Sequence, residues 1–289
     1  METTRSLIKT NVLILLFVLS ILFAFGAVAE ISGTTGQNLT WKLDDAGVLT
    51  ISGEGAMQDF ILYIDAPTRV PWGTEAKEVI IEDGVTRIGN GSFYGLTKLT
   101  KVSIPDSVKE IGNSAFYGCS SLENVVIPDS VTYIDNYAFY NCKSMRSIKL
   151  PQKLSMICES TFQGCAELTE ITIPVGTEWI GINAFDDCKK LMSVVLPVEL
   201  EKINCYAFKN CKALKTIYYT GTKAQWKAIR IDKVGNTELL KAKVQYSACL
   251  QHTWGEPTYE WGKHFYSATA SRSCLKCGIQ DHLYPSSLL

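Results

Sequence analysis

Four residues in the last part of the chain have the types and the spacing that could bind a metal ion. Two residues separate Cys249 from His252, and two residues separate Cys274 from Cys277. Thiolates and an imidazole at this spacing can complete a tetrahedral zinc site. A disulfide, either Cys274–Cys277 or Cys249–Cys274, is the alternative in an oxidising compartment, and a third outcome is that neither forms. The sequence predicts a small Cys/His module over residues 249–289 and leaves these three outcomes open.

Five of the other seven cysteines recur at a fixed interval of 23 residues. They are Cys119, Cys142, Cys165, Cys188 and Cys211. Parallel side chains on adjacent units would keep their Cβ atoms about 5 Å apart, whereas a disulfide needs about 3.8 Å. Leu96 occupies the equivalent place in the first unit, so a compact apolar side chain suffices there. We therefore expect buried free thiols, not a disulfide chain or a row of metal ions. The sequence assigns no role to Cys158 and Cys205.

Catalytic groups are scarce elsewhere. The three histidines, His252, His264 and His282, all follow the region of fixed interval, which therefore offers no Ser–His or Cys–His pair. Asp106 and Asp129 share a position in successive units, but we interpret them as turn residues at strand ends. The glycines near the start of the predicted fold, Gly33, Gly36, Gly53 and Gly55, lie at predicted hairpin turns and do not have the spacing of a phosphate-binding loop. We expect no enzymatic activity and, within this region, no cofactor.

The first residues have the features of a secretory leader. Arg5 and Lys9 precede an apolar run that ends at Phe25, and Ala27-Val28-Ala29 supplies the small residues of a cleavage site. This pattern predicts a signal peptide over residues 1–29, removed before Glu30, with a retained membrane anchor as the alternative. The net charge of −1 with mixed signs gives no electrostatic footprint for nucleic acid or an anionic membrane. We expect a secreted or cell-surface protein with no membrane span after leader removal.

A 23-residue repeat organises about half of the chain. Phenylalanines mark it without one insertion: Phe93, Phe116, Phe139, Phe162, Phe185 and Phe208. Each unit ends in two alternating apolar residues and, in five units, a proline, which predicts a short strand that the proline terminates. The Ala-Phe segment of each unit predicts one helical or 3₁₀ turn. Stacked units bury the apolar columns and form one parallel sheet, with Phe93 near the end packing against fewer neighbours than Phe139.

Non-repeating segments on both sides should close the ends of this stack. Alternating apolar residues in 39–43 and 49–51 flank a turn at 44–47 and predict a hairpin. Thr222 and Gln225 have the spacing of a capping box that opens a short helix through Trp226. The sequence thus predicts an N-terminal β-rich cap with a half-repeat over 30–84, six repeats over 85–219, and a C-terminal helix/strand cap over 220–248.

The repeated pattern I-G-x-x-A-F-x-G-C-x-x-L-x-x-V-x-I-P resembles the BspA-type leucine-rich repeats found in many bacterial surface and secreted proteins. The flanking segments Leu39–Met57 and Tyr218–Ile229 are also similar to those that border such repeats, and the tail resembles small modules at the ends of bacterial surface proteins. The resemblance implies an α/β solenoid, a leucine-rich repeat stack. It also implies a role in adhesion to host matrix proteins or to other cells, with a protein or glycan as the ligand.

The outward side chains of the predicted sheet are small and of mixed charge, with apolar character gathering toward the C-terminal end. Met192, Val195 and Tyr218 are the candidate binding residues there, since tyrosine is frequent at binding hot spots. An ordinary solvated sheet face is the alternative. We expect a non-enzymatic protein that binds a macromolecule through its solenoid. The alternative function is a structural spacer that presents a C-terminal module holding zinc or the cell envelope.

Overall fold

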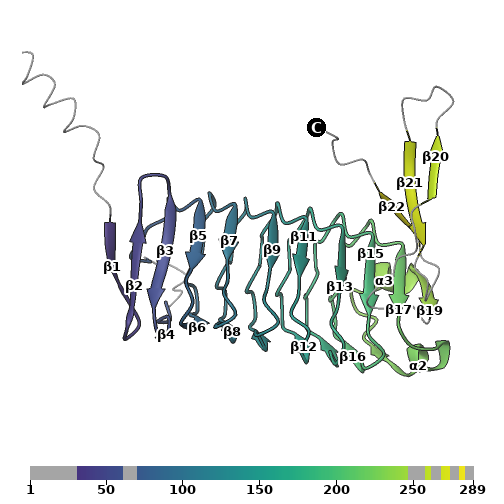
Figure 1. The fold of residues 1–289 in the computed structure, drawn as a ribbon. Helices are drawn as coiled ribbons and strands as arrows, with labels where there is room; N and C mark the ends of the chain where they lie inside the picture. The colour runs from purple at the N-terminus through teal and green to yellow at the C-terminus, as the bar shows by residue number, and fades with distance from the viewer. Residues whose placement is uncertain (1–30, 61–69, 247–257, 262–267, 274–279, 284–289) are drawn as a thin grey trace, which may run out of the picture.

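The chain forms a solenoid whose coils stack along one axis, as the computed structural model shows (Figure 1). The structure describes residues 31–60 and 70–246, together with three strands of the tail over 258–261, 268–273 and 280–283. The predicted metal ligands Cys249, His252, Cys274 and Cys277 lie outside these residues, as does the predicted leader 1–29. In the part of the chain that the structure describes, no helix is long and apolar enough to cross a bilayer.

One side of the solenoid carries the predicted parallel sheet. Its strands are β5 (Glu78–Ile81), β7 (Lys101–Ser103), β9 (Asn124–Val126), β11 (Ser147–Lys149), β13 (Glu170–Thr172), β15 (Ser193–Leu196), β17 (Thr216–Tyr219) and β19 (Lys243–Tyr246). Neighbouring strands are in register one repeat apart, as in the pair Val194 and Ile217. The hydrogen-bonded ladder is interrupted between β7 and β9 and again between β11 and β13. The leucine-rich repeat stack with a parallel sheet is confirmed.

A second parallel ladder, which the sequence analysis did not predict, runs along another side. Its strands are β4 (Gly55–Ala56), β6 (Val85–Ile88), β8 (Glu110–Ile111), β10 (Tyr133–Ile134), β12 (Met156–Ile157), β14 (Trp179–Ile180), β16 (Lys202–Ile203) and β18 (Arg230–Ile231). The hydrogen-bonded ladder is interrupted between β10 and β12. In most of the strands the isoleucine is buried and the residue before it faces outward. Two-residue strands are too short for an alternating pattern to be visible, so only the isoleucine column signals them.

The Ala-Phe segments form single turns closed by hydrogen bonds between residues three apart, as from the N–H of Tyr117 to the carbonyl of Ser114 at 3.1 Å, which supports the 3₁₀ alternative of the prediction. Two residues with positive φ bound each turn, such as Ser114 at 54° and Gly118 at 71°, so the turn does not extend into a longer right-handed helix. Alternate N–H groups instead donate to the next coil: the N–H of Phe116 donates to the carbonyl of Ala138 at 2.8 Å. The turns therefore make a third hydrogen-bonded side of the stack, because about every second N–H of the segment bonds to the next coil and the others close the local turns.

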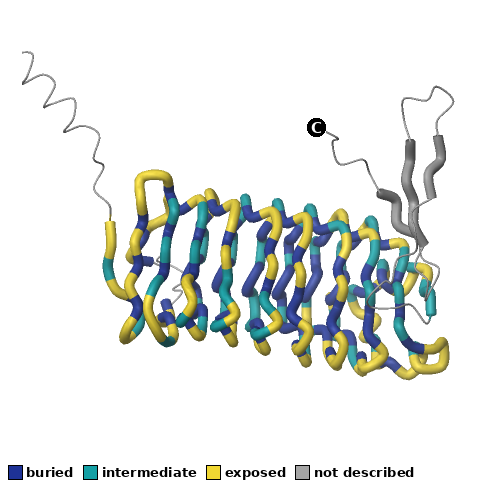
Figure 2. Tube along the Cα trace, viewed as in Figure 1, coloured by how far each residue is buried: buried dark blue, intermediate teal, exposed yellow. Residues whose placement is uncertain are grey.

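The phenylalanine column forms a continuous aromatic stack through the centre. Neighbouring rings from Phe93 to Phe208 are stacked with centroids between 5.1 and 5.7 Å apart. Trp72 continues the stack, with its centroid 6.0 Å from that of Phe93 and 5.9 Å from that of Trp41. The expectation that Phe93 packs against fewer neighbours is therefore wrong, because Trp72 covers its outer side. Figure 2 shows the buried residues repeating at the same places in successive coils.

The N-terminal end is closed by an antiparallel meander. Strands β2 (Leu39–Leu43) and β3 (Val48–Gly53) form the predicted hairpin, and the Asp44 carboxylate accepts the N–H groups of Ala46 and Val48 in its turn. Strand β1 (Ile31–Thr35), which was not predicted, pairs antiparallel with β2. Strand β3 then pairs in parallel with β5, so the meander joins the sheet of the repeats without a break.

The C-terminal end is closed by two short helices. Helix α2 (Lys223–Ala228) begins with the predicted capping box of Thr222 and Gln225, and Trp226 packs edge-on against Tyr219. Helix α3 (Thr237–Lys241) follows, and β19 ends the sheet. In the tail, β20 (Thr258–Trp261), β21 (Ala268–Ser273) and β22 (Gln280–Leu283) form an antiparallel sheet.

Candidate functional site

The structure brings two of the three predicted binding residues together. Val195 on β15 and Tyr218 on β17 are register partners, half-buried on the same face of the sheet. Met192 precedes β15, and its carbonyl accepts N–H groups from Lys215 and Thr216 while its side chain is exposed. The three residues therefore lie in two adjacent coils, but Met192 is outside the row that Val195 and Tyr218 share.

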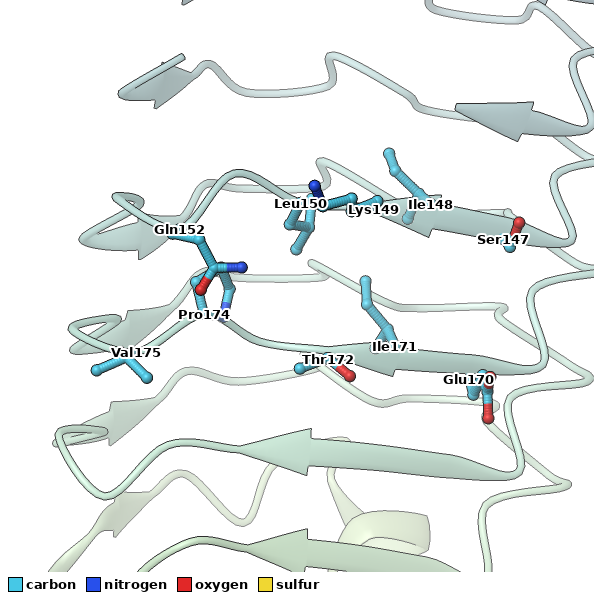
Figure 3. A pocket seen from close by; sticks show the side chains of 10 residues that line it. All are labelled: Ser147, Ile148, Lys149, Leu150, Gln152, Glu170, Ile171, Thr172, Pro174 and Val175. Atoms are coloured by element: carbon cyan, nitrogen blue, oxygen red, sulfur yellow. The ribbon is translucent and has the colours of Figure 1, made fainter. Parts of the chain in front are cut away.

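A shallow cavity of about 240 Å³ opens on the sheet face where the ladder is interrupted between β11 and β13. Ile148 and Ile171 belong to its apolar lining, and Lys149 and Glu170 contribute one charge of each sign. Figure 3 shows the two isoleucines leaning in the same direction along the stack, and the Gln152 side chain reaching toward Pro174 of the next coil. The cavity is an apolar gap between coils with a polar rim.

The cavity lining offers few groups that could do chemistry. It contains the hydroxyl of Ser147 beside Lys149 and Glu170, and no histidine or cysteine. Asp129 lies in the turn after β9, as expected, and its carboxylate accepts the N–H of Gln152 in the next coil at 3.2 Å. This carboxylate therefore bonds one coil to the next.

A stripe of large exposed side chains crosses the second ladder. We call Tyr133, Met156 and Trp179 the aromatic stripe; they occupy the outward position of β10, β12 and β14. Tyr133 is 41% exposed and Trp179 is 45% exposed, with Met156 half-buried between them. Single exposed apolar side chains are common on protein surfaces, but adjacent ones that form a continuous patch often mark an interaction site.

The repeat itself positions the aromatic stripe. Each of its residues precedes the buried isoleucine of its coil, so the same backbone places three successive side chains on one line. Charged residues occupy the same line beyond both ends. Arg87 lies 3.4 Å from Glu110 on one side, and Lys202 is the register partner of Trp179 on the other. The stripe is thus an apolar centre with a charged rim, the arrangement typical of protein interfaces.

Tyr133 is held from two directions. Its hydroxyl donates to a carboxylate oxygen of Asp135 at 3.3 Å. Burial raises the pKa of Tyr133, and the neighbouring Cys158 and Asp135 raise it further. Cys158, for which the sequence gave no role, is buried beside this hydroxyl, while Cys205 is half-buried in a turn two coils away. The two cysteines do not meet, as expected from their spacing.

The exposed large apolar side chains of the described residues are concentrated in the C-terminal half. They are Ile31, Val126, Tyr133, Val175, Trp179, Ile182, Met192, Val198, Tyr206, Val234 and Leu240. Toward the C-terminal end these residues lie on the turns, helix α3 and the second ladder, whereas the sequence predicted the gathering of apolar side chains on the sheet face. Sequence reasoning missed the aromatic stripe because it considered the sheet columns alone; the signal was the 23-residue spacing of Tyr133, Met156 and Trp179.

The column cysteines are free and buried, as predicted. Each thiol points at a phenylalanine carbonyl of the preceding coil, for example Cys165 at that of Phe139, 3.3 Å away. Burial raises the pKa of Cys165 to about 12, so the thiol stays protonated at neutral pH. The described ranges contain no group of three or more His, Cys, Asp or Glu side chains placed to hold a metal ion.

Comparison with known proteins places the repeats in a recognised group. The model of the BspA-type leucine-rich repeat region matches in six copies over residues 72–191 and 109–230, together more than half of the chain. The leucine-rich repeat protein of T. pallidum is 25% identical, with a TM-score of 0.50 over 75% of this chain and 99% of that one. Among curated proteins, no relative matches the chain.

Two further solved structures are similar over most of the solenoid. A leucine-rich repeat protein of Bacteroides ovatus is 22% identical, with a TM-score of 0.45 over 73% of this chain and 70% of that one. A leucine-rich cell surface protein of Faecalibacterium prausnitzii is 19% identical, with a TM-score of 0.33 over 72% of this chain and the whole of that one.

Proposed function

Because this chain belongs to the family of BspA-type leucine-rich repeat proteins, we propose that it is a non-enzymatic scaffold that binds another protein outside the cytoplasm. Secretion or display at the cell surface is part of the proposal and rests on the leader pattern of residues 1–29. The partner in this proposal is a protein of the cell surface or of the surrounding matrix, because related proteins are associated with adhesion to such surfaces.

The observation that carries the proposal is the exposure of the aromatic stripe. Burying the exposed parts of Tyr133 and Trp179 against a partner would recover part of the free energy that these apolar surfaces cost in water. Tryptophan and tyrosine are the residues that most often dominate the binding energy of protein interfaces. A methionine between them adapts its shape to a partner more readily than a branched side chain does.

The backbone beneath the stripe keeps it ready to bind. Ile157 and Ile180 in the same strands are buried, and β12 and β14 are hydrogen-bonded to one another. Met156 and Trp179 therefore project from paired strands, and Tyr133 projects from β10, which is paired with β8, so none of the three strands has to become ordered on binding. A surface of this kind loses little conformational entropy when it meets its partner, which favours affinity.

A second surface supports the same function with less exposed area. Val195 and Tyr218 lie side by side on the sheet face, and Gln245 of β19 continues their row. This surface, with Met192 beside it, remains our proposal for a further contact. It can be tested separately because the sheet face and the second ladder are formed by different strands of each coil.

The test is retention of partners by immobilised protein from extracts of envelope proteins and of host matrix. A variant with Tyr133→Ala, Met156→Ala and Trp179→Ala should lose the bound protein. Leu240→Ala in helix α3 is the matched control, because Leu240 is 50% exposed and lies outside both surfaces. A variant with Val195→Ala and Tyr218→Ala measures the contribution of the sheet face.

Two results would contradict the proposal. Equal retention by the stripe variant and the original chain would show that the stripe is not the contact. Loss of all binding on deletion of residues 249–289, with the stripe variant unaffected, would instead support the spacer function in which the tail does the work. Circular dichroism of each variant separates loss of contact from loss of fold.

A further inference from the structure

Strand β1 is an open edge of the sheet at its N-terminal end. In the described part of the chain β1 pairs with β2 alone, and it is the outermost strand of its sheet (Figure 1). All five residues from Ile31 to Thr35 are in register with β2, without a bulge. The first four are exposed or half-buried, whereas Thr35 at the inner end is buried, so the open part of the edge runs from Ile31 to Thr34. The N–H and C=O groups on the outer side of such a strand form a row that an extended chain can pair with.

This edge lacks the features that prevent pairing. Natural edge strands are protected by charged side chains, prolines or bulges, and the sequence Ile31-Ser32-Gly33-Thr34-Thr35 has none of them. Its apolar end is also open to solvent, since Ile31 is 48% exposed. The last strand of the solenoid sheet differs, because β19 carries the exposed Lys243. The two ends of the same sheet are therefore not equivalent.

We propose that β1 is the contact of a homodimer, in which the β1 strands of two copies pair antiparallel about a two-fold axis at Gly33. The strand is self-complementary in that arrangement. Ser32 faces Thr34 of the second copy on each side of Gly33, and Ile31 comes opposite the buried Thr35, so no like charges oppose one another across the axis. The net charge of −1 also leaves little repulsion between two whole chains.

The geometry favours a second copy over an unrelated strand. Antiparallel pairing of β1 with itself extends the alternation of β1 with β2, so the two antiparallel meanders become one continuous sheet. Gly33 lies at the centre, where the Trp41 ring of β2 fills the place of a side chain: a Cβ on Gly33 would come within 2.8 Å of the Trp41 indole nitrogen. The middle of the edge is therefore flat and free of projecting groups, which suits two identical strands.

The test uses the chain from Glu30 onward, the form expected after leader removal, in sedimentation equilibrium. The original chain should show a concentration-dependent monomer–dimer equilibrium. A variant with Ser32→Lys and Thr34→Lys should be monomeric at every concentration at which the original chain is dimeric, because lysines then oppose one another across the axis. A control with Ser103→Lys and Thr172→Lys adds the same charge at exposed positions of β7 and β13, away from the edge, and should still dimerise.

A charge-swap experiment completes the test. Mixing the double-lysine variant with a variant carrying Ser32→Glu and Thr34→Glu should restore a dimer that contains one copy of each. Amide exchange in β1 of the original chain should also slow as its concentration rises, and this readout needs no substitution. A chain that is monomeric throughout, or a lysine variant that dimerises like the original chain, would overturn the proposal.

Discussion

The Sγ atom of Cys142 lies 3.2 Å from the carbonyl oxygen of Phe116, in the preceding coil of the solenoid. The same contact recurs from Cys119 to Cys211 along the whole column. A cysteine here fills a small apolar space and also donates weakly to a carbonyl in a fully buried setting. The column thus connects each coil to the one before it without forming any covalent bond.

Cys142 and Cys165 should resist alkylation in the folded protein and react fully once it is unfolded without a reductant. Both are buried, and burial keeps their thiols protonated, whereas the thiolate is the reactive form. Mass spectrometry after labelling with iodoacetamide measures this. Cys205, which is only half-buried, provides the internal comparison and should react first. A need for reductant before labelling would show that disulfides are present.

Stability should fall as the pH rises above about 9, and Cys165 should contribute to the fall. Burial raises the pKa of its thiol from 9.0 to about 12, so the unfolded chain loses this proton before the folded one does. The stability that the protonated thiol contributes is complete below pH 9 and is lost between pH 9 and 12, at up to about 1.4 kcal/mol per pH unit. Cys165→Val should lose less stability over this window in urea unfolding. Identical pH profiles for the two chains would contradict the assignment.

Phe139→Ala should reduce the free energy of unfolding by about 3–5 kcal/mol, the range for removing a large buried aromatic side chain. Phe93→Ala should cost a similar amount, because Phe93 is fully buried between Trp72 and Phe116. Urea midpoints of the two variants give the comparison. A clearly smaller loss at Phe93 would mean that Trp72 does not extend the stack in solution.

Asn236→Ala should destabilise the C-terminal end of the solenoid by about 1–3 kcal/mol, the cost of leaving a buried donor unpaired. The Asn236 side chain accepts the N–H of Phe208 at 2.9 Å and donates to the carbonyls of Asn204 and Asp232. In the earlier coils the N–H of the phenylalanine donates to a carbonyl of the next coil, and the Asn236 side chain takes the place of that carbonyl after the last repeat. The control is Asn124→Ala on the exposed sheet face, which should change stability little. Equal urea midpoints for the two variants would show that Asn236 does not cap the stack.

The repeat made most of the fold predictable, because a period of 23 residues assigns every apolar column to the core at once. The hairpin before the repeats and the capping box at Thr222 were also predictable, since both depend on short local patterns. The backbone of the Ala-Phe turn was not. Its first left-handed position is occupied by residues as different as Ser114, Tyr137 and Asn183, and only Gly91 gives the usual glycine signal there.

Contacts between coils explain what the sequence pattern could not show. The left-handed residues hold their conformation because their N–H groups bond to the next coil, as that of Tyr137 does to Glu159. The role of Asn236 was not predictable for a different reason. It lies after the last repeat, so no equivalent residue 23 positions away indicates its place in the stack. The aromatic stripe was visible in the 23-residue spacing, but only knowledge of the second ladder shows that its side chains face outward.

The most direct test of the proposed function is site-specific photocrosslinking along the solenoid. A photoreactive amino acid is placed singly at Met156 or Trp179 in the stripe, at Tyr218 on the sheet face, or at Leu240 as the control, and each chain is exposed to envelope and matrix extracts. The proposal predicts a discrete protein adduct from positions 156 and 179 and none from position 240. Adducts that are equal at all four positions, or absent from both stripe positions, would contradict it.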